Sequence, residues 1–195
     1  MHSKENMNLQ YLNWKIFLEN PAETEPEEYF KVLNTWLPDS PEVFLDVADY
    51  NHVTDGPVMV LVGHYLNFSL DGNGRRLGLL LDYKQPMDGD NADKLCITLR
   101  DLLLAARRLE GEALFSHKPS FRTSELQLIV NSRAVSPNTP QTFAAVKTDL
   151  TKVLAKAYGD SAFTLDHLAD PRQRFAVHVT AKGNPDMAEM IKRLS

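Results

Sequence analysis

Two kinds of hydrophobic repeat alternate along the chain and predict a mixture of strands and helices. In residues 9–18, apolar side chains such as Leu12, Trp14 and Ile16 recur at every second position, which is typical of a strand. A change of pattern at Gly63, inside an apolar stretch, predicts a bulge or bend. Similar two-residue repeats predict further strands at residues 43–48, 58–70, 76–83, 125–131, 162–168 and 174–180.

Other apolar positions recur at helical spacing. The clearest case is residues 92–110, where Leu95, Leu99, Leu102 and Leu109 share one stripe. Further helices are predicted at residues 24–37, 140–158 and 185–195.

The order of the predicted elements divides the chain into two similar halves. Residues 1–120 hold a strand, a helix, three strands and a helix, and residues 121–195 hold a strand, a helix, two strands and a helix. A short echo that places Asp46 and Asp166 at matching positions supports the comparison. We therefore predict an α+β fold in which two strand-helix-strand-strand-helix halves pack as one globular unit and form a two-layer α/β sandwich. One continuous mixed sheet is the alternative, and the sequence does not decide between the two.

Composition and charge exclude some classes of partner. Hydrophobic residues make up 43% of the chain and charged residues 24%, which is ordinary for a protein that buries a core. The net charge is −5, and the densest basic spots are two pairs, Arg75-Arg76 and Arg107-Arg108. We therefore expect no nucleic-acid partner. The apolar runs are too short to cross a bilayer, so no membrane partner is expected either.

Cysteine use and the N-terminal residues bear on location. The chain has one cysteine, Cys96, which cannot form an intramolecular disulfide and fits a reducing compartment. Residues 1–8 are polar and lack the apolar segment of a signal peptide. These features predict a cytoplasmic protein.

One segment is dense in residues that can carry chemistry. It contains Asp46, Asp49, Tyr50, His52, Asp55, His64 and Asp71. Carboxylates and imidazoles make Asp46, Asp49, His52 and His64 candidate catalytic residues, and they make the two histidines candidate metal ligands. The spacing matches no established ligand motif.

Structural roles explain the same residues without chemistry. Asp49 and Asp55 suit turns, and His64 falls on the same strand face as Leu66, where it is expected to be half-buried. The run from residue 88 to residue 93 departs from the calcium-loop pattern and is interpreted as a helix cap. No cofactor is expected.

Some side chains fall outside the apolar stripes and are expected at the surface. His178 alternates with Val177 and Val179, so it is expected to face solvent or a partner. Tyr11, Tyr65 and Tyr83 are candidate residues of a partner surface.

Several stretches resemble an uncharacterised family of bacterial proteins of about this length. They are NWKIFLENP, LDVADYNHVTDGPVMVLVGH, RRLGLLLDYK, FRTSELQLIVNSR and SPNTPQTF, and the resemblance covers most of the chain, from Trp14 to about Val179. The resemblance implies a bacterial cytosolic protein, and it transfers no catalytic residue, cofactor or substrate to this chain.

Two functions are compatible with these observations. The first is a binding or protein-interaction protein without catalysis, which self-associates or binds a protein partner. The alternative is a small-molecule enzyme, such as a metal-dependent hydrolase, that uses residues 46–64. The enzyme hypothesis requires His52 and His64 within ligand or hydrogen-bond reach of each other.

Overall fold

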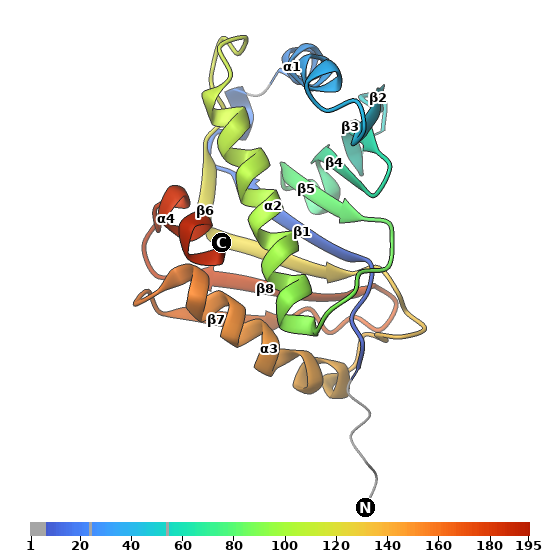
Figure 1. The fold of residues 1–195 in the computed structure, drawn as a ribbon, viewed down its shortest axis with the longest axis vertical. Coiled ribbons are helices and arrows are strands. Elements are labelled where there is room, and N and C mark those ends of the chain that lie inside the picture. Colours follow the sequence, from blue (N-terminus) through green and yellow to red (C-terminus); the bar gives the residue numbers. More distant parts are fainter. Residues whose placement is uncertain (1–6, 24, 54) are drawn as a thin grey trace, which may run out of the picture.

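A computed structural model of the chain describes residues 7–23, 25–53 and 55–195. Its strands form a single sheet in the order β2-β3-β4-β5-β1-β6-β8-β7 (Figure 1). The strands are β1 (Leu12–Leu18), β2 (Phe44–Asp49), β3 (Pro57–Gly63), β4 (Leu66–Asp71), β5 (Gly78–Tyr83), β6 (Phe121–Val130), β7 (Phe163–His167) and β8 (Phe175–Ala181). The helices are α1 (Pro26–Asp39), α2 (Asn91–Gly111), α3 (Pro140–Tyr158) and α4 (Met187–Leu194), with short 3-10 turns η1 (Pro21–Glu23) and η2 (Asn73–Arg75).

Both predicted halves contribute to this one sheet. Residues 1–120 supply β2 to β5 and β1, and residues 121–195 supply β6, β8 and β7. The two sets meet where β1 pairs with β6, and every pairing in the sheet is antiparallel. The mixed α+β content is confirmed, and of the two arrangements left open by the sequence the protein has the continuous sheet.

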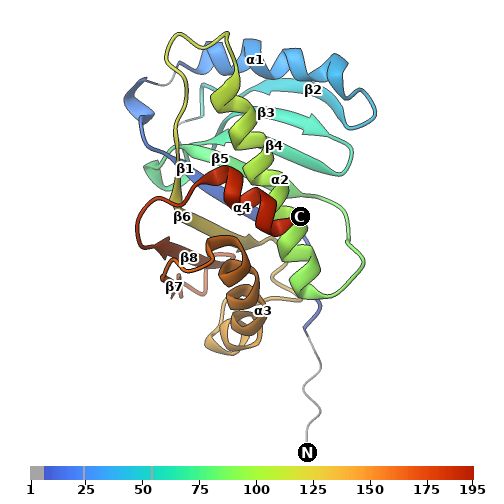
Figure 2. The same cartoon turned by 60° about the vertical axis from the view of Figure 1, so that its left-hand side comes forward.

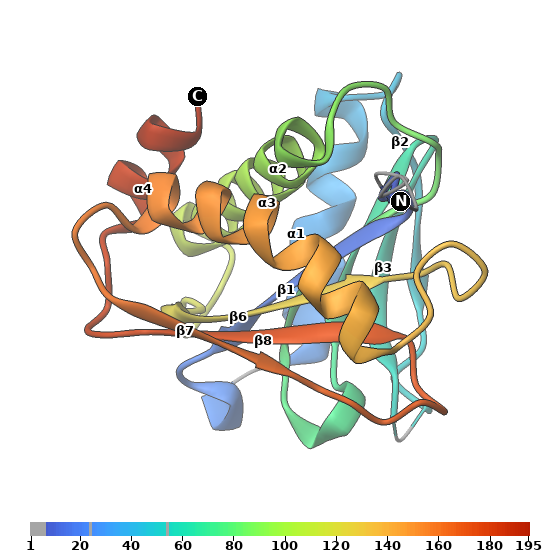
Figure 3. The same ribbon diagram turned by 90° about the horizontal axis from the view of Figure 1, so that it is seen from below.

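The four helices lie on one face of the sheet, as Figures 2 and 3 show. Helix α1 packs on β2 and β3, and α2 crosses β1 and β5. Helices α3 and α4 pack against α2 and against each other. The main core lies between these helices and the sheet, and a hydrogen bond of 3.0 Å from Trp14 Nε1 to Thr98 Oγ1 links β1 to α2 inside it.

Local sequence explains where the helices begin. Asp90 caps α2, since its side chain accepts a hydrogen bond of 2.8 Å from the backbone N–H of Asp93. Thr139 does the same for α3, at 3.2 Å from the N–H of Thr142. The interpretation of residues 88–93 as a helix cap is therefore confirmed. Thr24, at the predicted start of the first helix, lies outside the described residues.

The predicted strand at residues 58–70 is wrong, because it is two strands joined by a tight turn. The chain reverses at His64 and Tyr65, between β3 and β4. Gly63 permits the reversal, since a Cβ there would lie 2.8 Å from the carbonyl oxygen of Val43. His64 is consequently exposed in the turn, and its predicted half-buried position on a strand is also wrong.

The second face of the sheet carries no helix, yet its centre is buried. On β1, Trp14 and Ile16 point to the helices, and the alternating residues Asn13, Lys15 and Phe17 point to the other face. Lys15 is 2% exposed, and the other two are buried as well. Arg76 and His178 lie against Phe17, and Asp71 contacts Lys15, so these side chains cover part of this face.

Candidate functional site: a cavity on the helix-free face of the sheet

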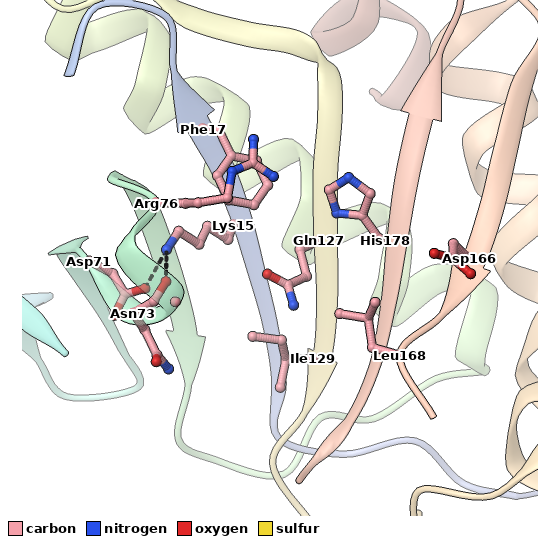
Figure 4. Close-up of a pocket in the computed structure, with 11 residues that line it drawn as sticks. Lys15, Phe17, Asp71, Asn73, Arg76, Gln127, Ile129, Asp166, Leu168 and His178 are labelled. Atoms are coloured by element: carbon pink, nitrogen blue, oxygen red, sulfur yellow. Dashed lines mark hydrogen bonds and ion pairs between the residues drawn. The ribbon is translucent and has the colours of Figure 1, made fainter. Parts of the chain in front are cut away.

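A cavity of about 420 Å³ opens on the helix-free face, between η2 on one side and β7 and β8 on the other (Figure 4). We call it the sheet-face cavity. A neighbouring hollow of about 380 Å³ shares Asn73, Gln127, Ile129 and Leu168 with it. The lining residues of the sheet-face cavity are Lys15, Phe17, Asp71, Asn73, Gly74, Arg76, Gln127, Ile129, Asp166, Leu168 and His178.

A buried ion pair forms one wall. Lys15 Nζ donates hydrogen bonds to Asp71 Oδ2 at 2.6 Å and to the carbonyl oxygen of Asn73 at 3.3 Å. Its third N–H has no acceptor among the described residues. Burial lowers the pKa of Lys15, and the attraction of Asp71 opposes that shift.

Gly78 makes this ion pair possible. It lies on β5, opposite Phe17 of β1 and opposite Asp71 of β4. A Cβ at Gly78 would lie 3.1 Å from Lys15 Cε and would collide with the carbonyl oxygen of Ile16. Because Gly78 has no side chain, the Lys15 methylenes can cross β5 and reach a carboxylate two strands away.

A second charged group closes the upper end of the cavity. Arg76 donates two hydrogen bonds of 2.6 Å each to the two oxygens of Glu125. His178 Nε2 lies 2.9 Å from Glu125 Oε1. The hydrogen bonds from Arg76 lower the pKa of Glu125. The Arg76 guanidinium also lies 4.0 Å above the centre of the Phe17 ring, so Phe17 supports the group from below.

Several polar side chains of the cavity make no side-chain hydrogen bond to any of the described residues. Gln127 stands near its centre, with Asn73 on one side and Asp166 on the other (Figure 4). Within the described part of the chain, neither the two amide side chains nor the Asp166 carboxylate makes a side-chain hydrogen bond. Ile129 and Leu168 add apolar surface beside them. The cavity thus combines unused donors and acceptors with a small apolar floor.

Next to Lys15, the same face holds a second polar pair, formed by a buried Asn13 and a half-buried Asp82. Asp82 of β5 faces Asn13 of β1 and accepts a hydrogen bond from it. Burial raises the pKa of Asp82. The Asn13 Oδ1 atom is buried and has no hydrogen-bond donor among the residues described. A row of buried polar side chains therefore runs along the helix-free side of β1.

The structure does not bring together His52 and His64. His52 precedes β3, which has seven residues, and His64 follows it. A strand of this length separates its two ends by about 20 Å, well beyond the reach of a shared metal ion. In the described residues, no group of three His, Cys, Asp or Glu side chains is arranged to hold a metal.

The two carboxylates predicted as candidate catalytic residues, Asp46 and Asp49, accept hydrogen bonds from the local backbone. Asp46 Oδ1 accepts from the N–H of Val47 at 2.8 Å, and Asp49 Oδ1 accepts from the N–H of Asn51 at 2.8 Å. Both lie on β2, at the far edge of the sheet from β7. Only Asp71, at the end of the segment, reaches the sheet-face cavity.

The other residues that were predicted to lie at the surface differ in their exposure. His178 lies on the helix-free face as its alternation predicts, although it is half-buried in the cavity. Tyr65 is 61% exposed, whereas Tyr83 is half-buried and donates a hydrogen bond of 2.6 Å to Asp101. Tyr11 is half-buried with a positive φ of 55°. Self-association stays a prediction.

Comparison with known proteins adds no further assignment. No protein-family model matches the sequence, and no curated protein matches it. The resemblance to a bacterial family therefore stays a prediction. None of the described helices is both long and apolar enough to cross a membrane.

Proposed function

We propose that the protein is a binding protein that holds a small polar molecule in the sheet-face cavity. The observation that carries the proposal is the unused hydrogen-bonding capacity around Gln127. The cavity is lined by the side-chain amides of Gln127 and Asn73, neither of which makes a side-chain hydrogen bond to the described residues. It is also lined by Lys15, whose third N–H has no acceptor among them. A ligand that supplied these partners would be held in a defined orientation.

Size and charge support a small ligand with a largely neutral body. The volume of about 420 Å³ lies in the range of small-molecule sites. Lys15 and Arg76 are each neutralised by a carboxylate, so the cavity presents little net charge. Because both cations are held in ion pairs, we assign them to the shape and polarity of the site and not to catalysis.

The position of the cavity also supports an internal duplication, which we infer from the strand order. The strands β1-β5-β4 and β6-β8-β7 follow the same order outward from the centre of the sheet. In sequence order, each set begins with a strand and a helix (β1 and α1; β6 and α3) and ends with two strands and a helix (β4, β5 and α2; β7, β8 and α4), and β2 and β3 are an addition to the first set. In this alignment β7 matches β4, so Asp166 of β7 does not correspond to Asp46 of β2 as the sequence echo placed it. The cavity lies over β1 and β6, at the junction of the two sets.

A variant that fills the cavity tests the binding function. We would measure the melting temperature of the wild type with a panel of amino acids, sugars, nucleosides and phosphomonoesters, and then of Gln127→Trp with any compound that stabilises it. We expect at least one compound to stabilise the wild type and to lose its effect in Gln127→Trp. Gln141→Trp is the matched control, because Gln141 is exposed on α3 on the opposite side of the sheet.

Two results would contradict the proposal. One is a panel in which no compound binds the wild type. The other is equal stabilisation of the wild type and Gln127→Trp, because binding would then take place elsewhere.

A further inference from the structure

Beside the sheet-face cavity lies a second cavity of about 350 Å³ that is rich in arginine. It shares Phe17 and Arg76 with the first cavity, so these two side chains border both cavities. Arg75 and Arg122 also line it, together with Leu18, Pro21 and Leu77. We call Arg75, Arg76 and Arg122 the arginine cluster.

The turn η2 positions Arg75 in the cluster. Arg75 has a φ of 58°, in the left-handed region that non-glycine residues seldom adopt. Its N–H is held by the carbonyl oxygen of Gly72 at 2.9 Å. The neighbouring Gly74 N–H is held by Asp55 Oδ1 at 3.0 Å. The turn therefore fixes Arg75 in a conformation that has an energetic cost.

Arg122 joins the cluster because of an irregularity in the sheet. The pairing of β1 with β6 shifts register between Ile16 and Leu18. Beyond this shift Phe121 is buried in the core, and Arg122, the next residue, points to the helix-free face. There its Nη1 lies 3.8 Å from Glu125 Oε2.

The cluster has an excess of positive charge. Glu125 is hydrogen-bonded to Arg76 and also forms an ion pair with Arg122. Within residues 7–23, 25–53 and 55–195, Arg75 forms no ion pair. Three guanidinium groups and one carboxylate leave two positive charges at one cavity, in a chain whose net charge is −5.

We propose that the arginine cluster binds the phosphate group of a small phosphomonoester whose remaining part lies in the sheet-face cavity. This rests on the proposed function and names the ligand class. A phosphomonoester carries close to two negative charges at neutral pH, which matches the excess at the cluster, whereas one carboxylate would neutralise only half of it. Guanidinium groups donate paired hydrogen bonds to phosphate oxygens, and Arg76 borders both cavities, so one ligand can contact both.

Inorganic phosphate is the first probe. Calorimetric titration at constant ionic strength compares the wild type with Arg75→Gln, Arg122→Gln and the control Arg107→Gln, which removes one charge at an exposed site on α2. We expect saturable phosphate binding that weakens about tenfold in each cluster variant and stays unchanged in the control. Acetate, a monoanion, should bind far more weakly than phosphate.

Several outcomes would overturn the inference: no saturable phosphate binding, equal weakening in Arg107→Gln, or acetate binding as tightly as phosphate. Circular dichroism shows whether each variant folds, and two cluster variants keep the test valid if one does not. If neutral compounds alone bind the sheet-face cavity, the binding function stands and this inference fails.

The second arm asks whether one ligand spans both cavities. Ribose 5-phosphate, ribose and inorganic phosphate are titrated into the wild type and Gln127→Trp. We expect a phosphomonoester to bind more tightly than inorganic phosphate and to lose that gain in Gln127→Trp, whereas inorganic phosphate binds both proteins equally. If each phosphomonoester tested, ribose 5-phosphate and those of the panel, binds no better than inorganic phosphate, the spanning ligand is overturned.

Discussion

Lys15 and Asp71 lie on strands that are not neighbours, and their side chains meet at 2.6 Å across the intervening strand β5. Both are almost fully buried, at 2% and 7% exposed. Such a pair is costly to break, because removing one member leaves the other charge buried without a counterion.

Replacing one member of this pair should destabilise the protein strongly. We expect Asp71→Leu to lower the free energy of unfolding by about 3 kcal/mol. The double variant Lys15→Met, Asp71→Leu should lose less than the single variant, since it buries no unpaired charge. Urea unfolding of Asp71→Leu, Lys15→Met and the double variant measures the three losses. A loss in the double variant equal to the sum of the two single losses would show that the two groups do not interact.

Gly78→Ala should be destabilising for a different reason. The added methyl group collides with the carbonyl oxygen of Ile16 and crowds Lys15 Cε, so we expect a loss of about 2 kcal/mol or more. Gly111→Ala is the control, because a Cβ there meets nothing within 4 Å and the residue ends helix α2. It should be neutral or stabilising by up to about 1 kcal/mol. Equal effects of the two substitutions in thermal unfolding would contradict this account.

Glu125 should contribute to the pH dependence of stability. Its pKa is lowered in the folded protein, mainly by the hydrogen bonds from Arg76, so ionised Glu125 stabilises the fold. This contribution is complete above the unfolded pKa of about 4.3 and disappears as the pH falls through the folded pKa. Glu125→Gln should therefore be less stable than the wild type at pH 7, by about 1 kcal/mol because Arg76 is partly exposed, and equally stable at strongly acidic pH. A constant difference across the pH range would be inconsistent with this cause.

Metal removal should leave the protein unchanged. Because His52 and His64 lie beyond opposite ends of β3 and are both exposed, we expect His52→Ala and His64→Ala each to change the free energy of unfolding by less than about 0.5 kcal/mol. Addition of a chelator should not alter the melting temperature. Stoichiometric metal in the purified protein that is lost in both variants would revive the enzyme hypothesis.

Local patterns predicted most elements, because they report which residues alternate and which recur at helical spacing. Helix α2 at Asn91–Gly111 closely follows the stripe that Leu95 and Leu99 begin. A bulge or bend was predicted at Gly63, but the full reversal of the chain there was not, because apolar residues continue through it and the close approach of Val43 to Gly63 is a long-range contact.

The site could be predicted only in part. The alternation around His178 correctly places it on the face away from the core. Lys15 and Gln127 were not predicted, although each is a polar residue between apolar neighbours on a strand, which is a usable signal. What they face depends on the order of β5, β1 and β6 in the sheet, and pairing between segments so far apart leaves no trace in a local repeat.

The position of β1 has a consequence for how the chain folds. Its first partner, β5, follows about 60 residues later, and its second partner, β6, is complete only at Val130. During synthesis, β1 therefore cannot pair on both sides until the chain has been made as far as Val130. Deleting β1 would divide the sheet into a four-stranded part and a three-stranded part. The edges of β5 and β6 would then be unpaired, and exposed strand edges are templates for aggregation.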